Sequence, residues 1–195
     1  KLAEFQKKLA ELRAAKQFSQ AFSRIQSARK DAQYAPLTAE ADTQEKALRA
    51  ELDRLFVPVD KEVKDQLKGR DFAQAQLKLG AQRLVFLNTP LQGKLDETEA
   101  LIKGLEKLHT KTIEAIDTSD PWTVPKESNL GRLDGKQVIG ASKDGIQAQV
   151  GPARFTVKWS DFSPKEVARI YERYTAPNDE ETKKYLKIYT GLFVQ

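Results

Sequence analysis

The side chains that could do acid–base chemistry are few and scattered. His109 is the single histidine of the 195-residue chain, and an imidazole at that position could act as a general base. No Ser or Cys nucleophile stands with it in a recognisable motif. A surface histidine on a helix, beside Glu106 and Ile113, is therefore the favoured interpretation.

Paired carboxylates are the second candidate for chemistry. Asp117 with Asp120, or the run Asp179–Glu181, could hydrolyse a glycoside or hold a divalent cation. Acids in the first turn of a helix explain the run at 179–181 more simply. The chain has no cysteine, no second histidine and no phosphate-binding glycine loop. We therefore expect no catalytic residue, no cofactor and no metal site.

Composition limits the class of protein that must position these side chains. With 39% hydrophobic and 31% charged residues, the chain can bury a core as one domain or two small ones. No apolar run approaches the roughly 18–20 residues of a membrane span, and the start lacks a secretory signal, so we expect a soluble protein without membrane insertion. The chain begins with Lys1 in place of an initiator Met, and its first nine residues already have a helical pattern. We therefore expect a fragment of a larger protein. No feature indicates a compartment.

Charge is spread evenly along the chain. The net charge of +5 divides into +3 over residues 1–118 and +2 over residues 119–195, and acidic residues alternate with basic ones. We therefore expect no nucleic acid among the partners, because a nucleic-acid binder normally clusters its cations on one face. The nucleic-acid alternative would require Lys136, Lys143, Arg154 and Lys158 on one face beside exposed aromatics.

The first two thirds of the chain contain an internal repeat. At an offset of 54 residues, eight of the 28 positions from Phe18 to Glu45 are identical to their counterparts. The identical residues are Phe18, Gln20, Ala21, Arg29, Pro36, Leu37, Asp42 and Glu45. A repeat of this kind usually means helical units that stack because none can bury its apolar face alone.

Each repeat unit reads as helices. Apolar residues recur at three- and four-residue spacing, as in the stripe Phe18, Ala21, Phe22, Ile25 and Ala28. Pro36 and Pro90 are expected to end the second helix of each pair, and Gly69 supplies a turn. Pro58 should kink or split the helix expected from about residue 41 to residue 68.

The segment from Lys68 to Ala75, followed by Leu79 and Pro90, resembles the turn and second helix of a tetratricopeptide unit, with Gly-x-x-Phe-x-x-Ala as its core. Residues 15–21 are a weaker copy without the glycine. The 54-residue period exceeds the usual 34, so longer helices or a plain antiparallel bundle are equally compatible. The resemblance implies a scaffold that presents a helical surface to another protein or a peptide.

A change of period marks the expected domain boundary near residues 117–121. Three alternating runs follow, separated by turns at Lys143–Gly145 and Gly151–Ala153, which predicts a three-stranded antiparallel meander over residues 136–160. Ser163-Pro164-Lys165-Glu166 is a full capping box and predicts a helix over about 164–175. A last helix is expected over about 179–193.

The strand and helix start around residues 157–164 resemble a module of the form V-x-W-x-D-L-S-P. That module belongs to large multidomain bacterial proteins of uncharacterised function, some of which carry kinase modules and helical repeats. The resemblance implies bacterial origin and an accessory role, and it carries over no catalytic residue.

Aromatic side chains are the candidate partner-binding residues, because tryptophan and tyrosine are enriched at interface hot spots. We select Trp122, Trp159, Tyr171 and Tyr174. For Trp159 a core position is the favoured interpretation, since it ends an alternating strand just before the capped helix. Trp122, between Pro121 and Pro125, could pack the helical part against the sheet or dock a partner.

The sequence as a whole predicts a mainly α protein with a small antiparallel β unit. A helical-hairpin repeat region or bundle would cover residues 1–118, in units of about 13–66 and 67–120, and a small α+β module would cover residues 122–195. We expect a non-catalytic protein-interaction or scaffolding segment whose partner is another protein, a peptide or other domains of the parent chain. The alternatives are an accessory or hydrolase domain of an enzyme and a nucleic-acid-binding module.

Overall fold

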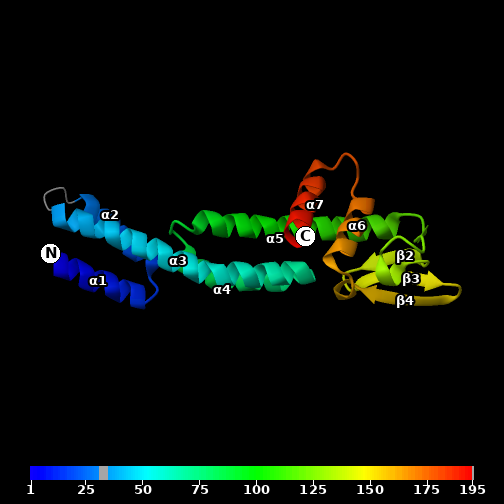
Figure 1. Cartoon of the computed structure of the whole chain (residues 1–195), viewed down its shortest axis with the longest axis horizontal. Coiled ribbons are helices and arrows are strands. Elements are labelled where there is room, and N and C mark those ends of the chain that lie inside the picture. The colour runs from blue at the N-terminus through cyan, green and yellow to red at the C-terminus, as the bar shows by residue number, and fades with distance from the viewer. Residues whose placement is uncertain (31–34, 195) are drawn as a thin grey trace. The chain divides into compact units, whose positions relative to one another are not determined.

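The computed structural model describes residues 1–30 and 35–194, and these form seven α-helices and one four-stranded antiparallel sheet (Figure 1). The predicted fold class, mainly α with a small antiparallel β unit, is confirmed. The chain divides into two compact units. Unit 1 comprises residues 1–64 and 74–99, and unit 2 comprises residues 65–73 and 100–195. This division differs from a cut at residue 118, because residues 65–73 and 100–118 group with the sheet.

Helices form all of unit 1. Its elements are α1 (Leu2–Ala14), α2 (Phe18–Lys30), most of α3 (Ala35–Gly69), most of α4 (Phe72–Phe86) and the first turns of α5 (Gln92–Thr118). The buried stripe expected on α2 is present, with Ala21 and Ile25 fully covered. Phe56 of α3 meets Phe86 of α4 edge to face at 5.4 Å, and Glu62 pairs with Lys78, so these two helices run antiparallel.

The 54-residue repeat is expressed in local structure. Lys16 and Arg70, 54 residues apart, both take positive φ angles, 54° and 64°, and each lies two residues before a helix that begins with phenylalanine. The ion pair between Arg29 and Glu45 has its counterpart 54 residues later, between Arg83 and Glu99. The two copies therefore keep the same turn and the same ion pair between successive helices.

Two prolines behave differently from expectation. Pro58 lies inside a continuous α3, so the helix is not split there. Leu52 and Phe56 before it and Val63 and Leu67 after it are all buried, and their packing outweighs one lost backbone hydrogen bond.

Pro36 lies in the first turn of α3, where its missing N–H has no intrahelical partner to lose, so it begins a helix there. The expected end of the preceding helix falls on residues 31–34, outside the described residues. Pro90 follows α4, as expected, four residues after the helix ends.

The sheet of unit 2 is a meander in the order β1-β2-β3-β4. Three strands agree with the predicted alternation: β2 (Gln137–Ser142), β3 (Gly145–Val150) and β4 (Ala153–Lys158). The short β1 (Trp122–Thr123) adds an edge strand that the pattern does not reveal, pairing Trp122 with Val138. Gly145 is required at its position, because a Cβ atom there would lie 2.2 Å from the carbonyl oxygen of Val157.

The capping box predicts the start of α6 (Pro164–Tyr174) correctly. The Ser163 hydroxyl accepts from the Glu166 N–H, and the Glu166 carboxylate accepts from the Ser163 N–H at 2.7 Å. Asp179 caps α7 (Glu180–Phe193) in a similar way, accepting from the Thr182 N–H at 3.0 Å. Short 3-10 turns η1 (Gly131–Leu133) and η2 (Trp159–Asp161) connect the sheet to its surroundings.

Gly104 of α5 provides a test of how tightly α7 packs in unit 2. A Cβ atom at position 104 would lie 2.0 Å from two ring atoms of Tyr185. We expect Gly104→Ala to destabilise the protein by about 1–3 kcal/mol through overpacking, although alanine in place of glycine would favour an isolated helix by about 1 kcal/mol. Chemical denaturation measures the change.

Gly93, on the same helix, is the matched control. Nothing lies within 4 Å of a Cβ atom placed there, so Gly93→Ala should leave stability unchanged or raise it by up to about 1 kcal/mol. A Gly104→Ala variant as stable as Gly93→Ala would contradict the packing of Tyr185 over this glycine.

Candidate interaction surfaces

The four aromatic residues predicted to bind a partner fall into two pairs. Trp159 and Tyr171 are buried, with exposed fractions of 3% and 1%. Trp122 and Tyr174 are half-buried and lie together, their ring centroids 6.4 Å apart. Burial removes Trp159 and Tyr171 from any candidate surface and leaves Trp122 and Tyr174 on one.

Trp159 and Tyr171 surround His109 in the interior of unit 2. The imidazole lies 4.6 Å from the Trp159 ring and 5.5 Å from the Phe72 ring, centroid to centroid, and its Nδ1 is 2.9 Å from the Tyr171 hydroxyl. The expectation of a surface histidine is therefore wrong. His109 faces an aromatic cluster because α6, far along the sequence, covers its side of α5.

Arg70 brings a positive charge to this cluster. One of its terminal nitrogens, Nη2, donates to the backbone carbonyls of Trp159 and Phe162, while Nε and Nη1 are buried without a hydrogen-bond partner. The buried Tyr189 hydroxyl also lacks a hydrogen-bond partner. Burial raises the pKa of Tyr189, and the nearby Arg70 opposes that rise. The cluster therefore holds one cation among neutral polar groups.

This environment keeps the imidazole neutral. Burial, and secondarily the charge of Arg70, lowers the pKa of His109 from its ordinary 6.5 to about 4. Burial also raises the pKa of Tyr171 well above its usual value. Because a general base works best with a pKa near the working pH, His109 is poorly suited to catalysis at neutral pH. The hydrogen bond to Tyr171 gives it a structural role.

Trp122 and Tyr174 form a half-exposed patch with Arg173. The Arg173 guanidinium carbon lies 3.6 Å from the Trp122 ring centroid and 5.7 Å from that of Tyr174. This is a cation–π arrangement between β1 and the last turn of α6. Trp122 thus joins parts of unit 2, and one face of its ring is already covered by a cation.

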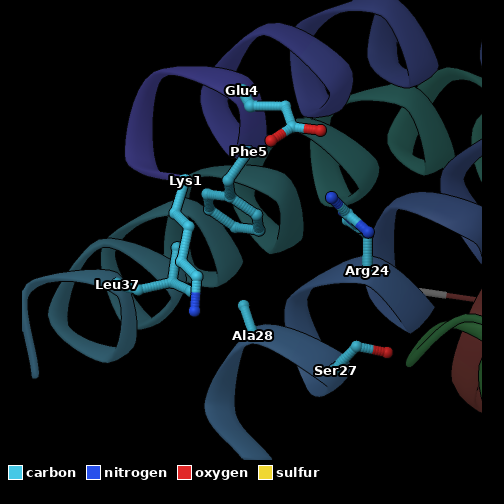
Figure 2. Close-up of a pocket in the computed structure, with 7 residues that line it drawn as sticks. All are labelled: Lys1, Glu4, Phe5, Arg24, Ser27, Ala28 and Leu37. Atoms are coloured by element: carbon cyan, nitrogen blue, oxygen red, sulfur yellow. The ribbon is translucent and has the colours of Figure 1, made fainter. Parts of the chain in front are cut away.

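Clefts lie within each of the two units, and one of about 450 Å³ in unit 2 has a polar and charged lining that includes Asp134, Glu166 and Arg169. In unit 2, a cleft of about 390 Å³ lies between α5, α6 and α7, lined by Thr112, Thr118, Tyr174 and Thr182, with the ion pair Lys111–Asp179 beside them. In unit 1, a groove of about 210 Å³ lies between α1, α2 and α3 (Figure 2). Phe5, Ala28 and Leu37 form its apolar floor, already largely buried, and Lys1, Glu4, Arg24 and Ser27 form a polar rim. The apolar floor of the unit 1 groove is therefore already covered.

The four cations that the nucleic-acid alternative requires do not share a face. In the β3–β4 register, Phe155 pairs with Ala148, so these two side chains share one face of the sheet, whereas Arg154 and Lys158 lie on the other face; Phe155 itself is 37% exposed. Lys136 lies on the Phe155 side, with its Nζ 5.8 Å from that ring. The geometry therefore does not assemble a basic aromatic patch.

One side of α4 is an exposed apolar feature of unit 1 that the sequence stripe does not single out. We call it the α4 outer face and define it by Leu77, Gly80, Ala81 and Leu84, all exposed. The exposed fractions are 63% for Leu77 and 85% for Leu84. A continuous row of this kind is unusual on a solvent-facing helix.

The α4 outer face carries no charge. The only charged residues of α4 are Lys78 and Arg83, and each is paired within unit 1, Lys78 with Glu62 at 3.1 Å and Arg83 with Glu99 at 2.6 Å. In a chain with 31% charged residues, this is a notable gap. The sequence hints at this face only through the mostly apolar composition of α4, which does not show which of its leucines are covered.

Comparison with known proteins adds no family or fold relationship: no family model, curated protein or solved structure matches the chain. Within residues 1–30 and 35–194, no group of three or more acidic, histidine or cysteine side chains is placed to hold a metal ion. No described helix is long and apolar enough to cross a membrane.

The buried imidazole predicts a pH dependence of stability. The unfolded chain protonates His109 near pH 6.5, whereas the folded chain resists protonation down to about pH 4. Since the unfolded state binds more protons in this window, stability should be complete above pH 6.5 and fall by about 3 kcal/mol as the pH drops to 4. Urea unfolding at pH 7.0, 5.5 and 4.5 measures the loss.

His109→Phe isolates this contribution, because the chain has no other histidine. The variant should lose less stability than the wild type between pH 7.0 and 4.5, and carboxylates that titrate near the lower limit cancel in the comparison. Identical pH slopes in the two proteins would contradict the buried neutral histidine.

Proposed function

We propose that the chain is a non-catalytic protein-interaction segment of a larger bacterial protein, and that the α4 outer face is its recognition surface. The bacterial and multidomain parts of this proposal rest on the resemblance of residues 157–164 alone. The single observation that supports recognition by α4 is the exposure of Leu77 and Leu84 on an uncharged helix side. Burying such leucines against a partner is worth about 1.5–3 kcal/mol each.

The repeat provides an internal comparison for this surface. Residues 54 positions before the α4 outer face lie on α2, and all four are exposed there as well. Those positions hold Ser23, Gln26, Ser27 and Lys30, in place of Leu77, Gly80, Ala81 and Leu84. The first copy of the repeat therefore folds with polar residues at the positions where the second copy has the α4 outer face. Packing within the repeat therefore does not explain why Leu77 and Leu84 are apolar, whereas contact with a partner would explain it.

The alternative of a hydrolase or accessory enzyme domain requires convergent carboxylates and a raised pKa on one of them. Glu40, Asp134 and Asp179 each have a pKa below the ordinary value, because hydrogen bonds favour their charged forms. Asp179 in particular is held by Lys111 and by the N–H and hydroxyl of Thr182. None of the three has the raised pKa of a general acid, which favours the interaction proposal.

Site-specific photo-crosslinking tests the proposal. A photoreactive residue at position 81 in the full chain should yield protein adducts in the cells that produce it, because the α4 outer face would lie against another polypeptide. The matched control carries the same residue at position 57, since Val57 is also an exposed apolar side chain of unit 1, at 66%, but lies on α3.

The repeat also supplies the disrupting variant. Leu77→Ser with Leu84→Lys gives α4 the residues that α2 carries at the same positions, so the fold should be retained and the adducts at position 81 should fall at least tenfold. Absence of adducts at position 81, with other proteins and with the chain itself, would overturn the proposal.

A further inference from the structure

We infer that the outer edge of β4 binds an acidic, extended segment of another protein, which joins the sheet of unit 2 as an additional antiparallel strand. This inference goes beyond the proposed function, because it assigns a second surface to a different kind of partner. β4 is the last strand of the sheet, and among the described strands it pairs with β3 alone, without a shift in register (Figure 1). Every residue of β4 except Val157 is exposed.

The backbone of β4 offers hydrogen-bonding groups along this edge. The Trp159 N–H donates to the carbonyl of Asp144, which directly precedes β3. Because backbone groups in an antiparallel pair point alternately toward and away from the neighbouring strand, those of Arg154 and Thr156 and the N–H of Lys158 point away from β3. Within residues 1–30 and 35–194 these groups have no hydrogen-bond partner. They are therefore available to the backbone of an added strand.

The same residues place uncompensated positive charge on the edge. Arg154 and Lys158 share one face of β4, and the residues opposite them on β3, Gln149 and Gly145, are neutral. Neither cation has an ion-pair partner in the part of the chain that the structure describes. The sequence from residue 145 to residue 160 contains no acidic residue. Acids on an added strand, directly opposite the two cations, would supply the missing negative charge.

These charges also select the occupant of the edge. Cations on an exposed strand discourage pairing with neutral and basic strands. In an antiparallel pair of two β4 strands centred on Thr156, Arg154 would lie opposite Lys158 of the partner subunit, and the like charges would repel. Nucleic acid fits poorly, because Phe155 lies on the face away from the two cations and offers no stacking surface beside them. An acidic polypeptide strand satisfies both the backbone and the charges.

The register predicts the residue pattern of the partner. Arg154 and Lys158 are four residues apart, so the partner should carry two acids four positions apart. The residue midway between them lies opposite Thr156. The two remaining residues lie on the face of Phe155 and Val157, where the Phe155 ring is 37% exposed and can pack against an apolar side chain. The expected pattern is acid, apolar, polar, apolar, acid.

A nuclear magnetic resonance titration of the full chain tests the site with the synthetic peptide Glu-Val-Thr-Val-Glu, blocked at both ends. The amide proton signals of Arg154, Thr156 and Lys158 should shift downfield as these groups become hydrogen-bonded. Two cross-strand ion pairs should make the peptide bind about ten times more tightly than Gln-Val-Thr-Val-Gln. Raising the salt concentration should reduce this preference by screening.

Charge reversal on β4 provides the matched variants. Arg154→Glu combined with Lys158→Glu should remove the preference for the acidic peptide. Lys165→Glu combined with Lys187→Glu changes the net charge by the same amount at exposed positions of α6 and α7, and it should keep the preference. Circular dichroism confirms that both variants remain folded.

N-methylated peptides test the backbone pairing without changing the protein. In an antiparallel strand the central Thr of the peptide exchanges hydrogen bonds with Thr156, whereas the N–H groups of the flanking Val residues point away from β4. A methyl group on the Thr nitrogen should therefore weaken binding about tenfold, and one on a Val nitrogen should change it by less than about twofold.

Three results would overturn the inference. The first is no shift of the β4 amide signals at about 2 mM acidic peptide. The second is equal affinity for the glutamate and glutamine peptides, which would remove the role of the two cations. The third is equal affinity of the two methylated peptides, which would mean attraction by charge without an added strand.

Discussion

The guanidinium group of Arg70 is the constraint on which the interior of unit 2 depends. Its residue takes a left-handed conformation in the turn between α3 and α4, with φ of 64°, and Nη2 reaches the carbonyl oxygens of Trp159 and Phe162. Those two residues connect β4 to the capped start of α6. Because a buried charge must find polar partners, this contact fixes the α3–α4 turn against the end of the sheet.

The surrounding groups stay neutral mainly because they are buried. Burial lowers the pKa of His109, and the charge of Arg70 lowers it further, so the imidazole stays neutral. Tyr171 is kept in its protonated form by burial and can share a hydrogen bond with the imidazole. His109, the side chain best suited to acid–base chemistry by its type, is thus part of a structural cluster. The α4 outer face, in contrast, consists of residues without titratable or nucleophilic groups.

Sequence reasoning succeeded where a signal is local. The Ser163–Glu166 capping box and the alternating strands depend on residues within a few positions, and both are present as predicted. It failed at His109, because the residue that buries its imidazole, Tyr171, is 62 positions away. It also missed the α4 outer face, since in a helix that is apolar on several sides the pattern cannot tell which leucines a neighbour covers. Trp159 is buried, as its place at the end of an alternating strand favoured, whereas for Trp122 the sequence left a packing role and a docking role equally open.

The repeat clarifies how the buried cluster relates to the rest of the chain. Arg70 and His109 lie 54 residues after Lys16 and Leu55, so the first copy has a turn lysine in place of Arg70 and a helix leucine in place of His109. The left-handed turn and the phenylalanine that follows it are shared by the two copies, and Phe72 packs against His109. The shared features therefore belong to the repeat itself, whereas Arg70 and His109 belong to the contact with the sheet and α6. The neutral imidazole beside a cation is stabilised by burial under the sheet and α6. The first copy has lysine and leucine at these positions and therefore needs no such cover.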